Sequence, residues 1–374
     1  MVENMKKIHI IIITILIVVG FGVWFAYTKN GGNIDIGRGE QKAVRVGLIT
    51  PLSGQYAVFG EVNKNAAQMA VEYFGTSTVE LFVEDDAYDS KKAVSAYKKL
   101  KTMNNIEAVI VLGAPSIQAI KPLSDADNIP LLGLGATLVY EKDSVFQLMP
   151  PGDNMMPTAG KIYSEKYSRI ALVGNNAELF KLNITNLKKG LDAKDIVYEA
   201  TLPSSMDYRT EVAKILKSNP EVVTVAFPLE EAIKFLKALN TLDTSRTVKI
   251  VCDWQAELST KEYVQAAGAD RLEGCLATGI PETADASFKE KYATKYGIPL
   301  QLTGDFTFDA IGILVELSKK VSPNAWVATL ADADYVYDRG VSGLIRFNDD
   351  GTRIDQEPKI SHFKNGKFEA YLGE

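Results

Sequence analysis

The sequence is poor in the residues that most often carry metal or acid–base chemistry. Its 374 residues include only two cysteines, Cys252 and Cys275, and only two histidines, His9 and His362. No CxxC pair and no Cys/His cluster occurs, which argues against zinc and iron–sulfur sites. His9 lies in an apolar run and His362 near the tail, so neither has an evident catalytic partner. We therefore expect no metal and no cofactor.

An excess of positive charge is also missing. The formal net charge is −6, and lysine and glutamate are interspersed along the chain. No basic stripe is therefore available to neutralise phosphates, and we expect no nucleic-acid partner.

The common enzyme motifs are missing as well: GxGxxG after the first strand, GxxxxGK[ST], GxSxG and HExxH. The acidic run Glu84–Asp86 with Asp89 is a candidate metal site. Its place directly before a predicted helix makes helix capping the simpler interpretation. The sequence thus favours a protein that is not an enzyme.

One long hydrophobic run stands at the amino terminus. It covers Ile8–Tyr27, is interrupted only by His9 and Thr14, and follows two lysines. At about 1.5 Å per residue it just spans a hydrocarbon core of about 30 Å. We interpret 1–28 as an uncleaved signal anchor. A cleavable signal peptide is the alternative, although no A-x-A-like site follows and a lipoprotein signal would need a nearby cysteine.

The segment 29–43 is Gly-rich and polar, which is typical of a flexible tether. Basic residues flank the hydrophobic run on both sides, so the charge bias gives little information on which end of the run faces the cytoplasm. The expectation that the rest of the chain lies outside the cytoplasm therefore depends partly on the fold.

From Val44 onwards, short apolar runs alternate with amphipathic stretches, and the series restarts after Pro150. This pattern predicts an α/β protein with two doubly wound parallel-sheet lobes. The first series has expected strands at 44–50, 79–86, 108–113 and 129–135, with helices at 59–74, 90–103 and 116–126. The second has expected strands at 169–174, 196–202, 222–228, 247–254 and 274–280, with helices at 177–191, 206–217, 230–241 and 260–267.

Small and hydroxyl residues follow the expected strands of the first lobe. Ser53 comes after the first strand, Ala114 and Ser116 after the third, and Gly135 and Thr137 after the fourth. A carboxylate binds well at such a helix N-terminus, held by backbone N–H groups and a hydroxyl. The alternative is that these are ordinary turns, in which such residues are common anyway.

Several segments in order resemble the type I periplasmic solute-binding proteins of the leucine/isoleucine/valine-binding family. They are VGLITPLSGQYAVFGEVNKNAAQMAVE, VEDDAYDSKKAVSAYKKL, IPLLGLGAT, MDYRTEVAKILKSNPEVV, GVSGLIRFNDDGTR and ISHFKNGKF, and together they cover about 44–370. The resemblance implies two lobes joined by three crossovers, a ligand enclosed by hinge closure, and delivery to an ABC permease. It places lobe 1 at 44–150 plus 280–340 and lobe 2 at 151–279 plus 341–374.

The same resemblance implies roles for individual residues. Thr137 and Gly135 match the family's contacts to the α-carboxylate, while Ala114 stands where the family has a serine, with Ser116 two residues on. Phe59 matches an aromatic of the first loop, and Asp253 matches the acid that pairs with the α-amino group.

Two further positions follow from the resemblance. Phe227 lies beside a position where the family has a tyrosine, and Asp309 matches a helix-packing position. The leading expectation is thus an extracytoplasmic receptor for an amino acid, with other carboxylates, amides and aromatic compounds as alternatives. A ligand-sensing module that signals to a membrane partner has the same site. Whether Cys252 and Cys275 pair stays open at this point.

Overall fold

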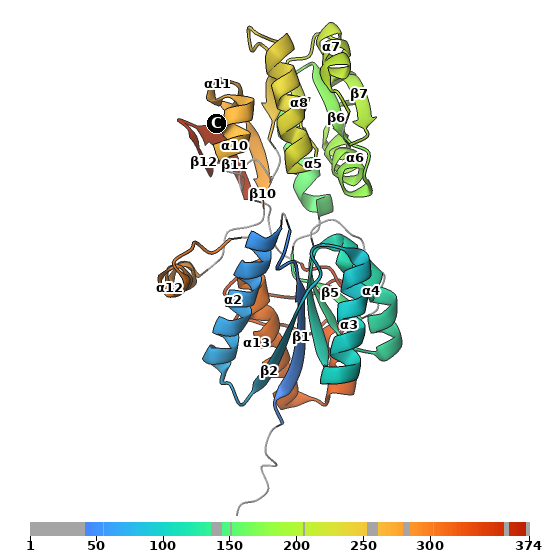
Figure 1. Cartoon of the computed structure of the whole chain (residues 1–374), viewed down its shortest axis with the longest axis vertical. Helices are drawn as coiled ribbons and strands as arrows, with labels where there is room; N and C mark the ends of the chain where they lie inside the picture. Colours follow the sequence, from blue (N-terminus) through green and yellow to red (C-terminus); the bar gives the residue numbers. More distant parts are fainter. Residues whose placement is uncertain are drawn as a thin grey trace, which may run out of the picture. The chain divides into compact units, whose positions relative to one another are not determined.

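Two parallel sheets, each built from alternating strands and helices, organise the chain (Figure 1). The computed structural model describes residues 42–54, 56–135, 144–149, 152–204, 206–252, 261–279, 285–301, 303–354 and 359–371. The predicted membrane segment 1–28 and most of the predicted tether 29–43 lie outside these residues. Among the helices that are described, none is long and apolar enough to cross a membrane.

The first sheet has the strand order β2-β1-β3-β4-β5 and is parallel throughout. Its strands are β1 (Val44–Thr50), β2 (Val79–Asp85), β3 (Ala108–Leu112), β4 (Leu131–Leu134) and β5 (Val145–Gln147). Successive side chains of a strand point to opposite faces. In β1, Leu48 joins one apolar cluster and Ile49 joins another, and in β3 Ile110 and Val109 divide in the same way. Because both faces are apolar, helices must cover both.

Helices α2 and α13 contribute to the cluster on one face of this sheet, and α3 and α4 to the cluster on the other. The helices of this lobe are α2 (Ala57–Phe74), α3 (Ser90–Asn104), α4 (Ala114–Asp127), α12 (Ala286–Tyr296), α13 (Gly304–Lys320) and α14 (Trp326–Leu330), with a short 3₁₀ turn at Pro323–Ala325. Helix α13 is buried without a break from Gly304 to Leu317. It therefore lacks the one-sided apolar pattern by which the other helices are recognised.

The second parallel sheet has the order β7-β6-β8-β9. Its strands are β6 (Ile170–Asn175), β7 (Ile196–Leu202), β8 (Val222–Thr224) and β9 (Lys249–Val251). Its helices are α5 (Gly152–Lys166), α6 (Glu178–Gly190), α7 (Arg209–Lys217), α8 (Leu229–Leu242), α10 (Lys261–Ala267) and α11 (Ala269–Leu272), with a 3₁₀ turn at Ala193–Asp195. Leu172 and Val173 of β6 belong to different apolar clusters, so this sheet too is covered on both faces.

The expected strand at 274–280 does not continue this parallel series. It forms β10 (Leu276–Gly279), which pairs antiparallel with β11 (Lys359–Lys364), and β11 pairs antiparallel with β12 (Lys367–Ala370). A disulfide between Cys252 and Cys275 joins the end of β9 to the start of β10, with a Cα–Cα distance of 5.7 Å. Both cysteines are buried. The bond thus fastens the antiparallel sheet to the parallel one.

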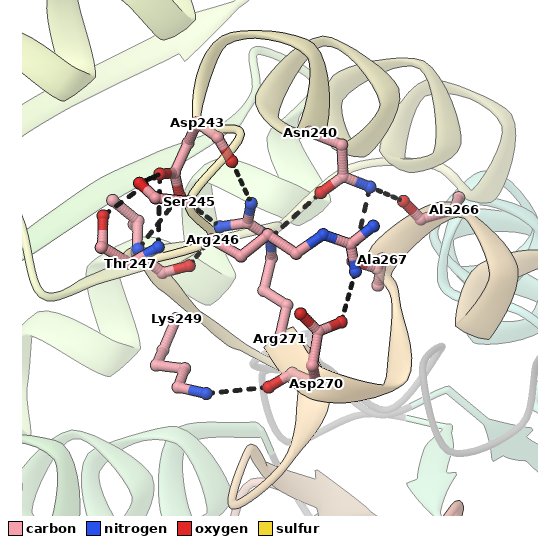
Figure 2. A network of polar contacts seen from close by, with 11 residues as sticks. Asn240, Asp243, Ser245, Arg246, Thr247, Lys249, Ala266, Ala267, Asp270 and Arg271 are labelled. Atoms are coloured by element: carbon pink, nitrogen blue, oxygen red, sulfur yellow. Dashed lines mark hydrogen bonds and ion pairs between the residues drawn. The ribbon is translucent and has the colours of Figure 1, made fainter.

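A buried ion pair lies near the start of β9, at the end of the strand opposite to the disulfide (Figure 2). Arg271 of α11 donates to a carboxylate oxygen of Asp243 at 2.7 Å, to the Asp243 carbonyl at 3.1 Å and to Asn240 at 3.1 Å. The Asp243 carboxylate also accepts the N–H groups of Thr247 and Val248. The guanidinium of Arg271 is fully buried, and this network fixes α8, α11 and β9 to one another.

One boundary between the lobes differs from the sequence-based assignment, which placed 341–374 in lobe 2. Ile345 and Phe347 belong to the apolar cluster of the first sheet, and Arg353 donates to the carbonyl of Leu148 at 3.3 Å. The third connection therefore leaves the first lobe after Ile354 and not at 340–343.

Candidate functional site

The carboxyl ends of β1, β2, β3 and β4 lie side by side, because these strands are neighbours in one parallel sheet. The loops that follow them therefore meet at one edge, which we call the first-lobe edge: residues 51–54, Tyr56, 86–89, 113–116 and Gly135. In open parallel sheets, ligands bind at the carboxyl ends of the strands. The sequence placed five of its candidate residues at this edge or directly beside it.

Ser53 is held at the edge by Asp85, the last residue of β2. The Ser53 hydroxyl donates to one carboxylate oxygen at 2.7 Å, and the Leu52 N–H donates to the other at 2.8 Å. Burial acts to raise the pKa of Asp85, but the hydrogen bonds from Ser53 and the backbone N–H groups outweigh it, so the pKa is lowered. Asp85 is therefore ionised at neutral pH and fixes the first loop against the second strand.

Ser116 has a different environment from the one that the sequence suggested. It is fully buried, and its hydroxyl donates to the Asp86 carboxylate at 2.5 Å. Burial raises the pKa of Asp86, while the hydrogen bond from Ser116 acts in the opposite direction. The hydroxyl proton of Ser116 is thus engaged in a hydrogen bond within the protein. The acidic run also contains the expected helix cap, since Asp89 accepts the N–H groups of Lys91 and Lys92.

The loop after β2 has an unusual backbone. Ala87 and Tyr88 both have positive φ values, +49° and +61°. Such a conformation costs a residue with a side chain about 1–3 kcal/mol and persists only where the surroundings enforce it. Here Asp85 accepts the N–H of Ala87 at 2.8 Å, and Asp86 accepts the N–H of Tyr88 at 3.0 Å.

Helix α4 begins at the first-lobe edge, directly after Gly113. Its N-cap, Gly113, has φ +99° and no side chain that could satisfy the first N–H groups of the helix. Gly135 lies directly against this turn: a Cβ on Gly135 would stand 3.1 Å from the Ala114 nitrogen. Ala114 is itself buried at the first helical position. Pro115 has no N–H, so the N-terminus of α4 offers the backbone N–H groups of Ala114 and Ser116 rather than a serine hydroxyl.

Three aromatic side chains line the same edge. The ring centroids of Tyr56 and Tyr88 are 4.3 Å apart, and those of Tyr56 and Phe59 are 6.4 Å apart. Phe59 is half-buried and packs on the apolar cluster beneath it. Gly113 leaves room for Tyr88, because a Cβ there would lie 2.4 Å from the Tyr88 ring.

Of the remaining predicted ligand contacts, only Phe227 lies within the described residues. Phe227 is fully buried in the core of the second lobe, with ring centroids 5.2 Å from Phe235 and 5.4 Å from Tyr208. Its ring therefore packs in the core and does not reach the surface. Thr137 and Asp253 lie outside the described residues, and they follow Gly135 and Cys252 by a few positions at most.

Sequence reasoning missed Tyr88 and the role of the acidic run as a scaffold. The available signal was an aromatic residue two positions after Asp86, at the end of an expected strand. No group of three or more His, Cys, Asp or Glu side chains suited to a metal ion occurs in the described part of the chain.

The chain is similar to known proteins in sequence and in fold. The family model described as "Periplasmic binding protein" matches residues 43–366. Among curated proteins, the chain is 23% identical over 211 residues to the leucine-, isoleucine-, valine-, threonine- and alanine-binding protein of Pseudomonas aeruginosa. That match covers 48% of this chain and 52% of the relative, so the chain spans about half the length of this relative.

Solved structures share the fold. A leucine-binding protein from Thermotoga maritima superposes with a TM-score of 0.73 at 18% identity, covering 88% of this chain and 98% of that one. An ABC-transporter solute-binding protein from R. palustris in complex with benzoate gives a TM-score of 0.70 at 18% identity, covering 88% and 96%. With the family model matching nearly all of the described residues, the chain belongs to the periplasmic binding protein family.

Proposed function

We propose that the chain is an extracytoplasmic solute receptor that captures a small carboxylate, in the first instance an amino acid, and delivers it to an ABC permease. The observation that carries the proposal is the N-terminus of α4, which opens at the first-lobe edge behind Gly113 without a side-chain cap. Backbone N–H groups at a helix N-terminus are a ready site for a carboxylate.

The proposed contacts follow from this geometry. The N–H groups at the start of α4 and the backbone around Gly135 hold the carboxylate, and Phe59 covers the apolar part of the ligand. Thr137, which follows Gly135, adds a hydroxyl, and Asp253 of the second lobe pairs with an ammonium group. Ser53 and Ser116 support the loops through Asp85 and Asp86 and do not contact the ligand.

The relatives support a carboxylate in particular. Leucine, isoleucine, valine, threonine, alanine and benzoate, which appear in the names of the similar proteins, all carry one. They differ in whether an ammonium group stands beside it. The carboxylate is therefore the group that these ligands share, and substitution of Asp253 tests whether an ammonium group is also recognised.

We also propose that the hydrophobic run Ile8–Tyr27 anchors the receptor in the membrane with Val44 and all that follows outside the cytoplasm. The run is long enough to span a bilayer. Fractionation of cells that express the full chain should recover it with membranes, and protease added to intact spheroplasts should digest the binding lobes. Recovery in the cytosolic fraction would contradict this proposal.

A thermal-shift screen of the purified full chain tests the function. The panel contains the amino acids, their amides and small carboxylates, including benzoate. A ligand at about one hundred times its dissociation constant stabilises the folded state by about 2.7 kcal/mol, which raises the melting temperature visibly. Saturable shifts with carboxylates, and none with the matching amides, are expected. Shifts with amides but not with acids would contradict the proposed recognition.

A further inference from the structure

The backbone of Tyr88 is fixed by several hydrogen bonds in the loop that follows β2. Tyr88 lies three residues after the end of β2, whose neighbour in the sheet is β1, so its loop stands beside the loop that follows β1, residues 51–54 and Tyr56. Its backbone is in the left-handed region and is enforced by hydrogen bonds from the Ala87 and Tyr88 N–H groups to the carboxylates of Asp85 and Asp86. Asp86 is in turn fixed by Ser116 at the start of α4.

The ring of Tyr88 faces the same edge as the uncapped start of α4. It lies over Gly113, where any side chain would collide with it, and against Tyr56 on the other side. Residue 88 as a whole is partly exposed to solvent. Its hydroxyl makes no hydrogen bond to any residue in the described part of the chain. Burial raises the pKa of Tyr88, so the hydroxyl keeps its proton at neutral pH.

We propose that Tyr88, supported by Tyr56, is a specificity-determining residue that selects carboxylates whose apolar part is a planar ring. This inference rests on the proposed function and names the ligand class of the same site. The N-terminus of α4 holds the carboxylate, and the ring of Tyr88 stacks with the ring of the ligand.

The physical basis is the geometry of aromatic pairs. Rings prefer offset or tilted contacts with centroids about 4.5–7 Å apart, and such contacts add to what the buried area alone contributes. A saturated ring of the same size buries a similar area but has no such preference. The expected advantage of a planar ring is about threefold to tenfold in the dissociation constant.

Two matched pairs of ligands separate this effect from size. Benzoate is compared with cyclohexanecarboxylate, and L-phenylalanine with L-cyclohexylalanine, by isothermal titration of the full chain. The wild-type protein should bind the planar member of at least one pair about threefold to tenfold more tightly. Tyr88→Leu should abolish this ratio while leaving affinity for the saturated member within about twofold, and Tyr88→Phe should retain the ratio.

Tyr73→Leu is the matched control, because Tyr73 is 74% exposed on α2, outside the first-lobe edge, and should leave the ratio unchanged. If Tyr88→Leu lowers the melting temperature, Tyr56→Leu supplies a second test of the same ring pair. Equal binding of planar and saturated members, or a ratio unaffected in Tyr88→Leu, overturns the inference while the receptor function stands. Failure of every carboxylate to bind overturns both.

Discussion

Ser342 donates both its backbone N–H and its hydroxyl to one carboxylate oxygen of Asp309, over 2.9 Å and 2.6 Å. The other oxygen of Asp309 accepts the N–H of Val341 at 2.8 Å. Asp309 lies on α13 and is fully buried, so all three donors would lose their partner together if the carboxylate were removed. The family resemblance that placed Asp309 at a helix-packing position is consistent with these contacts.

The same cluster joins the first-lobe ends of the three connections between the lobes. Arg353, which precedes the third connection, donates to the Ser342 hydroxyl at 2.9 Å and to the carbonyl of Leu148, which precedes the first. The carbonyl of Val341 accepts the N–H of Asp285, which follows the second, at 2.9 Å. One buried polar cluster therefore fixes all three chain segments at the same place in the first lobe.

Asp309→Ala should destabilise the protein by about 2–4 kcal/mol, because it leaves three buried donors and the buried guanidinium of Arg353 without this carboxylate. Urea unfolding followed by circular dichroism measures the change. Asp349→Ala removes an exposed carboxylate nearby and should alter the free energy of unfolding by less than about 0.5 kcal/mol. Equal effects of the two substitutions would show that the Asp309 cluster is not important for stability.

The free energy of unfolding of the wild-type protein should depend on pH because of Asp309. Burial raises the pKa of its carboxyl to about 7, although the hydrogen bonds from Ser342 and Val341 act to lower it. Between about pH 4 and pH 7 the folded state therefore holds a proton that the unfolded state has released. This group makes stability fall as pH rises through that window, by up to about 1.4 kcal/mol per pH unit, and adds no slope above it.

Asp309→Asn should remove this contribution, because asparagine does not titrate. The free energy of unfolding measured from pH 4.5 to pH 8 should then fall less steeply in the variant than in the wild type. The comparison uses slopes, so a constant loss of stability in the variant does not affect it. Parallel curves would mean that Asp309 is ionised throughout the range.

Arg271→Met should destabilise the second lobe by about 3–5 kcal/mol, because it leaves the buried carboxylate of Asp243 without its cation. Arg246→Met is the control: Arg246 pairs with Asp270 at the exposed rim of the same network (Figure 2) and should cost less than about 1 kcal/mol. Chemical unfolding at neutral pH distinguishes them. A loss below 1 kcal/mol for Arg271→Met would contradict the importance of the buried pair.

Replacing both Cys252 and Cys275 by alanine should cost about 2–4 kcal/mol, since their bond closes a loop with a sequence separation of 23. The bond itself is checked by alkylating the denatured protein without reductant, after which mass spectrometry should find no modified cysteine. Two modified cysteines would show that the thiols are free.

Four of the five strands of the first sheet were predicted, because buried parallel strands are apolar on both faces; β5 (Val145–Gln147) was not predicted. The expected strand at 44–50 coincides with β1, and the other three agree within a few residues. Helix α13 gave no such periodic signal, because it is apolar nearly all round. The pairing of β10 could not be predicted from the local sequence pattern, because its partner β11 lies far along the chain.

The sheet edge that carries the candidate site was predictable, but the contacts within that edge were not. The loops after the strands meet at one edge, as expected for a parallel sheet. The hydroxyl of Ser116, however, is bonded to Asp86 from a different loop, a contact that no spacing in the sequence reveals. Phe227 belongs to the core because its neighbours in space are Phe235 and Tyr208. From the sequence alone, an apolar residue at a strand end is equally compatible with the core and with a ligand site.

Hydrogen exchange with and without ligand tests the central claim most directly, namely that a carboxylate binds at the first-lobe edge. The full chain is saturated with the compound that gives the largest thermal shift, and amide exchange is followed by mass spectrometry. Peptides that contain the start of α4 and residues 86–89 should exchange more slowly when the ligand is bound, whereas residues 104–107 at the opposite end of the strands should be unchanged. Protection that is absent from the edge, or that appears only at 104–107, would contradict the account.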